Sequence, residues 1–336
     1  MKDSRGRLSQ NCGIFCPLCS FLSLKCRLLL KFLQNAARLS GFQSQGGART
    51  GAREGRIKMK KMKRIVSLVL SVIMAAGLMA AGTACSKSSD DKVLRVGMEC
   101  AYAPYNWTQD DDSNGAVKIN DSDKYANGFD VQMAKKIAES MGYKLEIVKT
   151  EWDGLVPAVQ SGKINAVVAG MSITADRAAS VDFSDPYFVA DVVVLTMNDS
   201  KFAAAASLSD LGGAKMTSQI NTVWYTLLEQ IPGAEVQTAL DTVPSLIVAL
   251  TSGKIDACTV DVPAAMAAVY SNPDIKILQF SAGSGFDVSN EDTDLGIAVK
   301  KGNKDLVAGI NKGLAAISTA DREALMKTAI EQQPLA

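Results

Sequence analysis

One arginine stands apart in the middle of the chain. Arg177 is the only arginine in residues 96–321, and it ends a short polar segment that begins at Ser172. Its guanidinium is planar and always charged, so it can hold a carboxylate through two parallel hydrogen bonds, which a lysine ammonium cannot do. Arg177 is therefore a candidate carboxylate-binding residue. A surface ion pair with Asp176 or Asp182 is the alternative role.

The chain contains no histidine. This absence excludes Ser-His-Asp and Cys-His catalysis, histidine metal ligation and the most common general base. Two carboxyl groups can still act as an acid and a base, and Glu99 and Asp153 are candidates for such a pair. Because the chain has no histidine and nothing in the sequence indicates a raised carboxyl pKa, we predict no enzyme activity. We also predict no metal site and no cofactor.

The charged residues are unevenly distributed along the chain. Residues 1–84 carry 15 basic and two acidic residues, whereas residues 85–336 carry 21 basic and 33 acidic ones. Such asymmetry is typical of a targeting segment joined to a soluble body. The acidic body argues against nucleic-acid binding, which requires a basic face. With 336 residues, 47% of them apolar, the chain is long enough for two domains.

Residues 58–84 have the pattern of a secretory signal peptide. The basic stretch KMKKMKR is followed by an apolar run that starts at Ile65 and becomes rich in Ala and Gly before Cys85. A membrane span is the alternative, because the run approaches the length that crosses a bilayer. The Ala84-Cys85 junction and the polar linker 85–92 resemble a bacterial lipoprotein signal, in which Cys85 would be lipidated. Gly82 stands where lipoproteins usually have Leu, and Gly82-x-Ala84 also suits an ordinary signal peptidase.

Residues 1–57 precede this signal and contain four of the seven cysteines. Cys16 and Cys19 form a C-x-x-C pair, but no second pair with zinc-ligand spacing follows in the body. We expect residues 1–57 to be an extension outside the working protein.

An internal repeat organises the remaining chain. Residues 156–170 resemble residues 247–261, and in both the end of a helix, a stop at Gly162 or Gly253 and a short apolar strand follow one another. Helices that lead into continuously apolar strands indicate α/β units with buried parallel strands. We therefore predict two similar α/β lobes, in which Gly170 and Asp261 occupy matching places.

Other patterns suggest how the lobes are connected. Apolar residues at helical spacing predict a helix over 129–141, ended by Gly142. The β-branched run 191–197 could cross from one lobe to the other, and 295–299 could return. Strands are predicted over 93–98 and 144–150, and helices that pack back on the first lobe from residue 305 onwards.

Four motifs resemble the polar amino acid-binding proteins of bacterial ABC transporters, the family-3 solute-binding group. They are GFDV at 128–131, EWDGL at 151–155, AGMSITADR at 169–177 and VDFSDPY at 181–187. The resemblance implies a periplasmic-binding-protein type II (Venus-flytrap) fold, with a first lobe from 93–194 and 293–336, a second from 195–292, and a two-stranded hinge. It further implies a monomer, outside the cytoplasmic membrane, that closes around a free amino acid and delivers it to a separate permease and ATPase.

The resemblance also implies roles for particular residues. Arg177, with Ser172 beside it, would hold the ligand carboxylate, and Thr174 would cap the helix that carries the arginine. Gly170 would let the backbone approach the ligand. Asp261 would bind the ammonium group, and capping a helix that starts near residue 263 is its alternative role.

The remaining candidates surround the same ligand. Thr222 would offer an amide to the carboxylate at the start of a helix over 223–230, although Asn221 replaces the usual Gly of the family. Tyr102 and Trp152 would cover the ligand side chain, unless they are ordinary core aromatics. Glu99 could contact a polar or cationic side chain.

Residues 106–127 form a long polar insertion that the family does not explain. Asp110, Asp112, Asn114 and Asp121 have spacing similar to a calcium loop. Asn114-Gly115 also suits a hairpin turn, which we favour because no helical pattern flanks the segment.

Two functional alternatives remain. One is an enzyme on the same scaffold, because relatives of the fold include a dehydratase. The other is a sensory module that presents its ligand to a receptor. Cys100 and Cys258 fall in different lobes, and we expect both to be buried free thiols, since a disulfide between them would lock the lobes.

Overall fold

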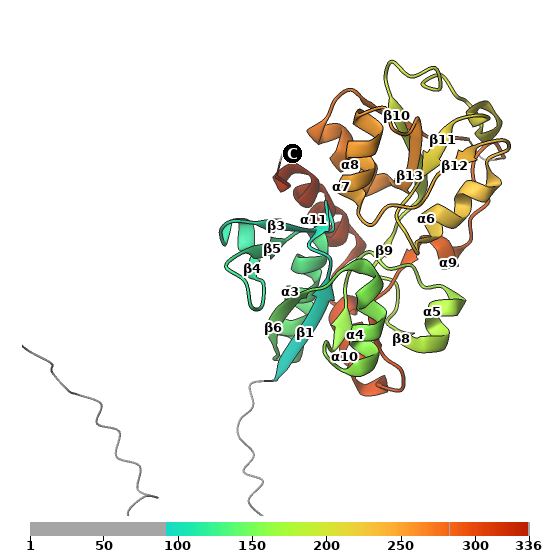
Figure 1. Ribbon diagram of the computed structural model, residues 1–336. Coiled ribbons are helices and arrows are strands. Elements are labelled where there is room, and N and C mark those ends of the chain that lie inside the picture. Colours follow the sequence, from blue (N-terminus) through green and yellow to red (C-terminus); the bar gives the residue numbers. More distant parts are fainter. Residues whose placement is uncertain (1–91, 282, 335–336) are drawn as a thin grey trace, which may run out of the picture. The chain divides into compact units, whose positions relative to one another are not determined.

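A computed structural model describes residues 92–281 and 283–334 (Figure 1). The expected extension 1–57, the signal peptide 58–84 and the proposed lipidation site Cys85 lie outside the described residues. Within the described ranges, no helix combines the length and apolar character needed to cross a membrane.

The first lobe is built on a five-stranded mixed sheet in the order β6-β1-β7-β16-β8. Strand β1 runs parallel to β6 and β7, whereas β16 is antiparallel to β7 and β8. The strands are β1 (Val93–Met98), β6 (Lys144–Lys149), β7 (Ala166–Val167), β8 (Val181–Phe183) and β16 (Ala298–Lys300).

The second lobe repeats this arrangement in the order β12-β11-β13-β10-β14. Here β11 runs parallel to β12 and β13, and β10 is antiparallel to β13 and β14. Strand by strand, the order and directions match those of the first sheet. The strands are β10 (Val192–Met197), β11 (Lys215–Thr217), β12 (Glu235–Val236), β13 (Ala257–Asp261) and β14 (Ile275–Leu278).

The internal repeat corresponds to the middle of each sheet. In the first lobe, α4 (Leu155–Ser161) ends at the left-handed Gly162 and leads to the central strand β7. In the second, α7 (Val243–Thr251) is followed by the left-handed Gly253 and the central strand β13. The predicted pair of similar α/β units is therefore confirmed, and Gly170 and Asp261 each lie four residues after the first residue of the central strand.

Helices pack on both sheets (Figure 1). Helix α3 spans Phe129–Met141 as predicted, buries Met133, Ala134 and Ile137, and ends at Gly142 in the left-handed conformation. The other helices are α5 (Ala175–Ser180), α6 (Val223–Thr226), α8 (Val262–Ser271), α9 (Asn290–Thr293), α10 (Lys304–Ala315) and α11 (Thr319–Gln332).

The connection between the lobes differs from the expected one. Strands β9 (Phe188–Val189) and β15 (Asp294–Leu295) form a two-stranded antiparallel ribbon between the two sheets. The run 191–197, expected to cross, instead forms β10 inside the second sheet, where its β-branched residues are buried on both faces. The return begins in β15 and continues into β16 of the first sheet.

The C-terminal helices also depart in part from expectation. Helix α10 packs on α3 of the first lobe, as predicted, but α11 contacts both α3 and α8, which belong to different lobes. The buried Gln333 side chain then donates a hydrogen bond to the Ala267 carbonyl of α8 (3.1 Å). The last helix is therefore tied to the second lobe as well as the first.

The polar insertion belongs to a small antiparallel sheet in the order β2-β3-β5-β4. Its strands are β2 (Ala101–Tyr102), β3 (Asn106–Gln109), β4 (Val117–Lys118) and β5 (Tyr125–Asn127). The prediction of a hairpin at Asn114-Gly115 is wrong. The strands on either side of this turn, β3 and β4, do not pair with each other, because both pair with β5. Both turn residues do have positive φ angles.

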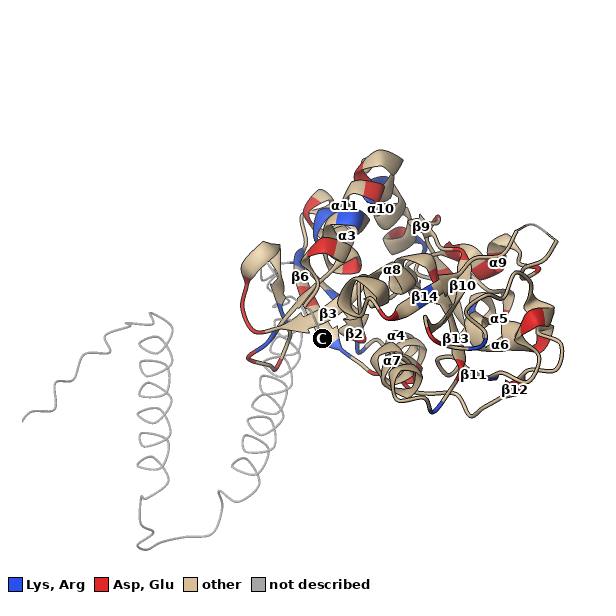
Figure 2. Cartoon of the chain, turned by 90° about the horizontal axis from the view of Figure 1, so that it is seen from above, with Lys and Arg blue, Asp and Glu red and all other residues tan. Residues whose placement is uncertain are grey.

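The calcium-loop interpretation finds no support in the placement of the acidic residues. Among residues 92–281 and 283–334, no group of three His, Cys, Asp or Glu side chains is arranged to hold a metal ion. Asp110 instead pairs with Lys124 (2.7 Å). In Figure 2, both basic and acidic positions are coloured along the loops of this small sheet. Cys100 and Cys258 are buried and free, as predicted, and burial raises the pKa of each thiol to about 12.

Candidate ligand-binding site

The carboxylate of Asp261 joins the two lobes. Asp261 ends β13 and is 1% exposed. One of its oxygens accepts hydrogen bonds from the Ala264 amide (2.9 Å) and the Tyr105 hydroxyl (3.2 Å), and the other accepts from the Tyr102 hydroxyl. The helix-capping role is therefore present, together with two hydrogen bonds from the first lobe. Burial raises the pKa of Asp261, whereas the hydrogen bond from Tyr102 lowers it.

Gly170 makes room for the tyrosine that reaches Asp261. Its φ angle of +58° is left-handed, and a Cβ atom on it would lie 2.8 Å from Cε1 of Tyr102. Tyr102 stacks on Tyr105 with 4.8 Å between ring centroids. The Gly170 amide donates to the Tyr187 hydroxyl (3.0 Å), which donates to the buried Asp130 (2.7 Å). The backbone of Gly170 thus lies close to an aromatic ring, and its expected approach to the ligand stays a prediction.

Arg177 lies on α5 and contacts both lobes. Thr174 caps this helix and accepts a hydrogen bond from the Arg177 amide (3.3 Å), as predicted. The guanidinium donates from Nη1 to the Ser172 carbonyl (2.9 Å) and from Nη2 to the Asn221 carbonyl of the second lobe (3.0 Å). It also lies over the Trp152 ring, 5.3 Å from its centroid. Desolvation lowers the pKa of Arg177 to about 10, so the group stays charged at neutral pH.

The alternative ion pair of Arg177 is not formed. Asp182, on the edge strand β8, is paired with Lys301 (3.2 Å) and Lys304 (3.0 Å). Within the described part of the chain, no carboxylate lies within ion-pair distance of Arg177, which leaves unused guanidinium donors for another acceptor.

Glu99 is a buried acid with an incomplete set of partners. It follows β1, is 3% exposed, and accepts a hydrogen bond at Oε1 from Gln219 of the second lobe (2.8 Å). Its Oε2 atom is buried without a hydrogen-bond partner. Burial raises the pKa of Glu99 to about 7, against the lowering effect of the Gln219 hydrogen bond.

Glu99 and Gln219 occupy matching positions of the two sheets. Val96 pairs with the first residue of β7, and Met216 pairs with the first residue of β13. Glu99 and Gln219 each lie three residues further along the chain, just beyond the ends of β1 and β11. The two positions that correspond in the fold are therefore hydrogen-bonded to each other where the lobes meet.

Thr222 starts α6 in the second lobe. Its hydroxyl accepts a hydrogen bond from the Tyr225 amide (3.3 Å) and donates to the Gln219 carbonyl (2.7 Å). The helix expected over 223–230 is α-helical only at Val223–Thr226, and a 3₁₀ turn follows at Leu227–Gln230. Asn221 takes the left-handed conformation (φ +55°) that the usual Gly of the family would adopt readily.

Ser172 and Trp152 complete the predicted set. Ser172 is 3% exposed and forms a β-bridge with Leu295 of the interlobe ribbon. Trp152 is 9% exposed, and its indole N–H donates to the Asn221 carbonyl (3.4 Å). Both side chains are thus buried, and Trp152 is buried against the other lobe.

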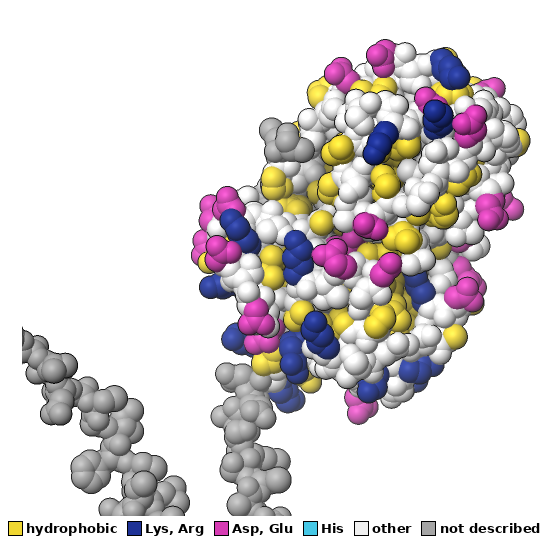
Figure 3. Space-filling view, viewed as in Figure 1, with side chains coloured by type: hydrophobic (Ala, Val, Ile, Leu, Met, Phe, Trp, Pro, Cys, Tyr) yellow, Lys and Arg dark blue, Asp and Glu magenta, His cyan; other side chains and the backbone are white. Residues whose placement is uncertain are grey.

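The predicted residues therefore come together where the lobes meet, and acidic and apolar side chains gather on this face in Figure 3. The sequence did not single out Tyr105, Gln219 or Asp130. For Tyr105, the only signal was its position three residues after Tyr102.

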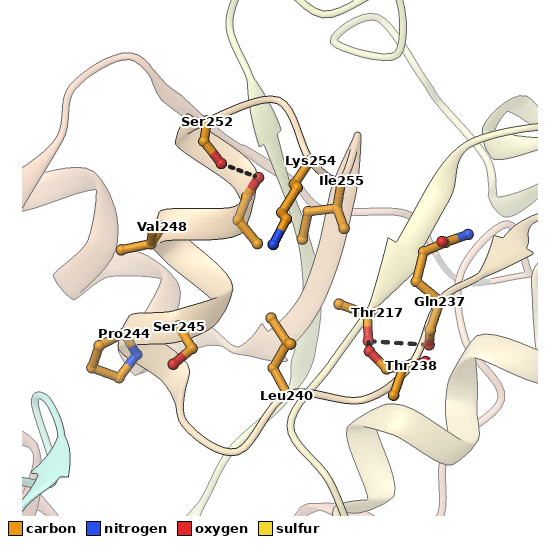
Figure 4. A pocket seen from close by; sticks show the side chains of 11 residues that line it. Thr217, Gln237, Thr238, Leu240, Pro244, Ser245, Val248, Ser252, Lys254 and Ile255 are labelled. Atoms are coloured by element: carbon orange, nitrogen blue, oxygen red, sulfur yellow. Dashed lines mark hydrogen bonds between the residues drawn. The ribbon is translucent and has the colours of Figure 1, made fainter.

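Two hollows elsewhere on the surface are lined by none of the predicted ligand-binding residues. One, of about 700 Å³, lies on the second lobe beside α7 (Figure 4). Leu240, Lys254 and Thr217 line it, and the Thr217 hydroxyl donates to the Thr238 carbonyl (2.9 Å). Another, of about 620 Å³, lies between β2 and β3 of the first lobe and α7 and α8 of the second.

Two α/β lobes of matching topology, joined by a ribbon, with buried charged groups at the carboxyl ends of their strands, define a two-lobed binding protein. The chain belongs to the bacterial extracellular solute-binding proteins, family 3, whose family model matches residues 94–328. This assignment confirms the family that the four motifs indicated.

Individual relatives are similar over most of their length. A probable histidine-binding protein of Campylobacter jejuni is 29% identical over 233 residues, which cover 69% of this chain and 82% of that protein. An ancestral arginine-binding protein bound to arginine has a TM-score of 0.58 at 34% identity, covering 70% of this chain and 97% of that one. An ancestral amino acid-binding protein, a precursor of cyclohexadienyl dehydratase, has a TM-score of 0.58 at 28% identity, covering 71% of this chain and 95% of that one.

Proposed function

We propose that this protein captures a free amino acid between its lobes and delivers it to the permease of an ABC importer, which a separate ATPase drives. The observation that carries the proposal is the junction of the lobes. There, helix α5 of one lobe holds a guanidinium that has no carboxylate partner among the described residues, and strand β13 of the other holds a buried carboxylate. A zwitterion needs one fixed cation and one fixed anion. The names of the relatives support an amino acid as the ligand.

In this proposal, Arg177 holds the ligand carboxylate with the help of Ser172 and Thr222, and Asp261 binds the ammonium group. Because Asp261 already accepts a hydrogen bond from Tyr102, an incoming ammonium shares or replaces that donor. Trp152 and Tyr102 cover the side chain of the ligand, and Gly170 leaves the space that Tyr102 occupies.

We infer that the preferred ligand is cationic or carries a strong hydrogen-bond donor. Glu99 has a buried oxygen without a partner, and a buried polar atom of this kind costs about 1–3 kcal/mol until a donor reaches it. A positively charged side chain would also favour the ionised form of Glu99. Relatives named for histidine and arginine are consistent with this inference.

An enzyme is the second candidate. The raised pKa of Glu99, about 7, is what a general acid or base requires, and a dehydratase precursor is among the structural relatives. Against it, Asp153, the expected partner acid, is hydrogen-bonded to Asn221 and makes no hydrogen bond to Glu99. We therefore propose a protein without catalytic activity. Conversion of more than one equivalent of an amino acid into a product would contradict this proposal.

We further propose a monomer that is held at the outer face of the cytoplasmic membrane by a lipid on Cys85. The support is the signal-like sequence before this residue, together with the extracellular character of the family. A single acyl chain binds membranes only marginally, so a second chain is needed. Cys85→Ala should move the protein from the membrane fraction to the soluble one; retention there would refute the anchor. A receptor that reads the bound ligand is the alternative partner.

Calorimetric titration with all twenty amino acids, after unfolding and refolding to remove carried-over ligand, tests the binding function. We expect binding by one or a few amino acids, and its loss in Arg177→Ala and in Asp261→Ala. Arg95→Ala, which removes an exposed arginine of β1, serves as the matched control and should bind like the parent. Unchanged binding in both site variants would show that the site is wrongly assigned.

A further inference from the structure

Asn221 makes three hydrogen bonds from the second lobe to the first. Its carbonyl accepts from Nη2 of Arg177 (3.0 Å) and from the indole N–H of Trp152 (3.4 Å). Its side-chain amide donates to Oδ1 of Asp153 (2.8 Å). Arg177, Trp152 and Asp153 all belong to the first lobe, so one residue gathers three contacts across the junction.

The left-handed backbone at Asn221 makes this arrangement possible. With φ at +55°, Asn is one of the few residues besides Gly that occupies this region at low cost, because its short polar side chain can hydrogen-bond locally. A glycine would keep the backbone and the carbonyl in place. The bond to Asp153 depends on the asparagine side chain, so it is available to this chain and not to a protein with Gly at the position.

The Asn221–Asp153 hydrogen bond itself uses no group proposed to bind the ligand, although the Asn221 carbonyl contacts two such residues, Arg177 and Trp152. Asp153 and Asn221 are exposed, whereas Asp261 and Glu99 are buried. No hydrogen bond links Asp153 to Asp261, Glu99 or Arg177. The bond thus joins two exposed side chains from different lobes.

We propose that the Asn221 side chain, through its bond to Asp153, is a positioning group that stabilises the arrangement described here, in which the two lobes touch and which we call closed. In that arrangement the carbonyls of Ser172 and Asn221 hold the guanidinium of Arg177 from both lobes. An interaction present only in the closed arrangement raises the closed population and slows opening. The consequence for ligand retention rests on the proposed amino acid-binding function. The effect on lobe closure itself does not depend on it.

A double-mutant cycle on the full chain tests the proposal. Asn221→Gly removes the amide but keeps the left-handed backbone, and Asp153→Ala removes the acceptor. Glu151→Ala is the matched control, because it removes an exposed negative charge two residues away that makes no hydrogen bond to the second lobe. Fluorophores are attached at positions 136 and 276, where exposed lysines are replaced for labelling. The distance between the two fluorophores reports closure in the absence and presence of the bound amino acid.

We expect Asn221→Gly and Asp153→Ala each to lower the ratio of closed to open protein by about twofold to fivefold, the range for an exposed charged contact. The double variant should lose no more than either single variant, and Glu151→Ala should behave like the parent. Additive losses, or no change in closure, would overturn the proposal. A coupled loss of closure in a protein that binds none of the twenty amino acids would uphold the proposal while removing the binding function.

Discussion

Replacing Gly170 by alanine should damage both stability and the junction of the lobes. An alanine in the left-handed conformation costs about 1–2 kcal/mol. In addition, its Cβ would lie 2.8 Å from Cε1 of Tyr102, a ring that cannot move freely because it stacks on Tyr105 and donates to Asp261. Overpacking of this kind costs about 1–3 kcal/mol. We therefore expect a total loss of about 2–5 kcal/mol in the free energy of unfolding.

Gly162 provides the matched control. It is also left-handed, with a φ angle of +80°, but nothing lies within 4 Å of the position its Cβ would take. Gly162→Ala should therefore show the backbone cost alone, about 1–2 kcal/mol. Urea denaturation of both variants, with m-values checked to be equal, measures the difference between them.

A third variant isolates the steric contact. In a Tyr102→Ala background the ring is gone, so Gly170→Ala should cost no more than Gly162→Ala. If Gly170→Ala costs no more than the control in the presence of Tyr102, the tyrosine is free to move, and the argument that Gly170 positions it is refuted.

Two further predictions concern ionisation and reactivity. Burial raises the pKa of Glu99 from 4.5 to about 7, so its proton is held more tightly in the folded protein, and the free energy of unfolding should fall as the pH rises from about 4.5 to about 7. In Glu99→Gln, denaturation curves across this pH range should show a smaller fall in the free energy of unfolding. Part of the fall should remain, because burial also raises the pKa of Asp130 to about 7. An unchanged fall would contradict the raised pKa of Glu99. Cys100 and Cys258, buried with pKa values of about 12, should resist iodoacetamide at pH 8 until denaturant is added, and rapid modification of the native protein, measured by mass spectrometry, would show that these thiols are accessible.

Much of the fold could be predicted from local periodicity in the sequence. The helix over Phe129–Met141 was predictable to the residue because its apolar positions follow helical spacing and Gly142 supplies the left-handed stop. The repeat around Gly162 and Gly253 likewise predicted two lobes with matching central strands. Both signals are encoded within about fifteen consecutive residues, where spacing alone is informative.

Features that depend on distant pairings were not predictable in the same way. The β-branched run of β10 is compatible with a crossing strand and with a buried central strand, and only its partners β13 and β14 distinguish the two. Asn114-Gly115 has the turn residues of a hairpin, but the choice of β5 as the common partner of β3 and β4 is a long-range choice.

The candidate site was proposed from residue types, whereas its contacts could not be predicted, and its ligand-binding role stays a prediction. Arg177 was proposed from its motif and Asp261 from the internal repeat and the family resemblance, whereas the hydrogen bonds of Asp261 to Tyr102 and Tyr105 span more than 150 positions. Asn221 was visible in the sequence as a departure from the family, but its bond to Asp153 depends on how the lobes meet. No spacing rule relates residues on separate lobes.

The matching positions of the two sheets carry unlike residues. Gly170 of one lobe corresponds to Asp261 of the other, and Glu99 corresponds to Gln219. Two identical lobes would present the same groups from both sides, and a small polar molecule could then lie between them either way round. Here, turning a zwitterion end for end would bring its carboxylate against Asp261, which like charge opposes. If the ligand is held as proposed, a scaffold that is nearly symmetric thus acquires a direction from a few side chains, and a zwitterion binds between the lobes in a single orientation.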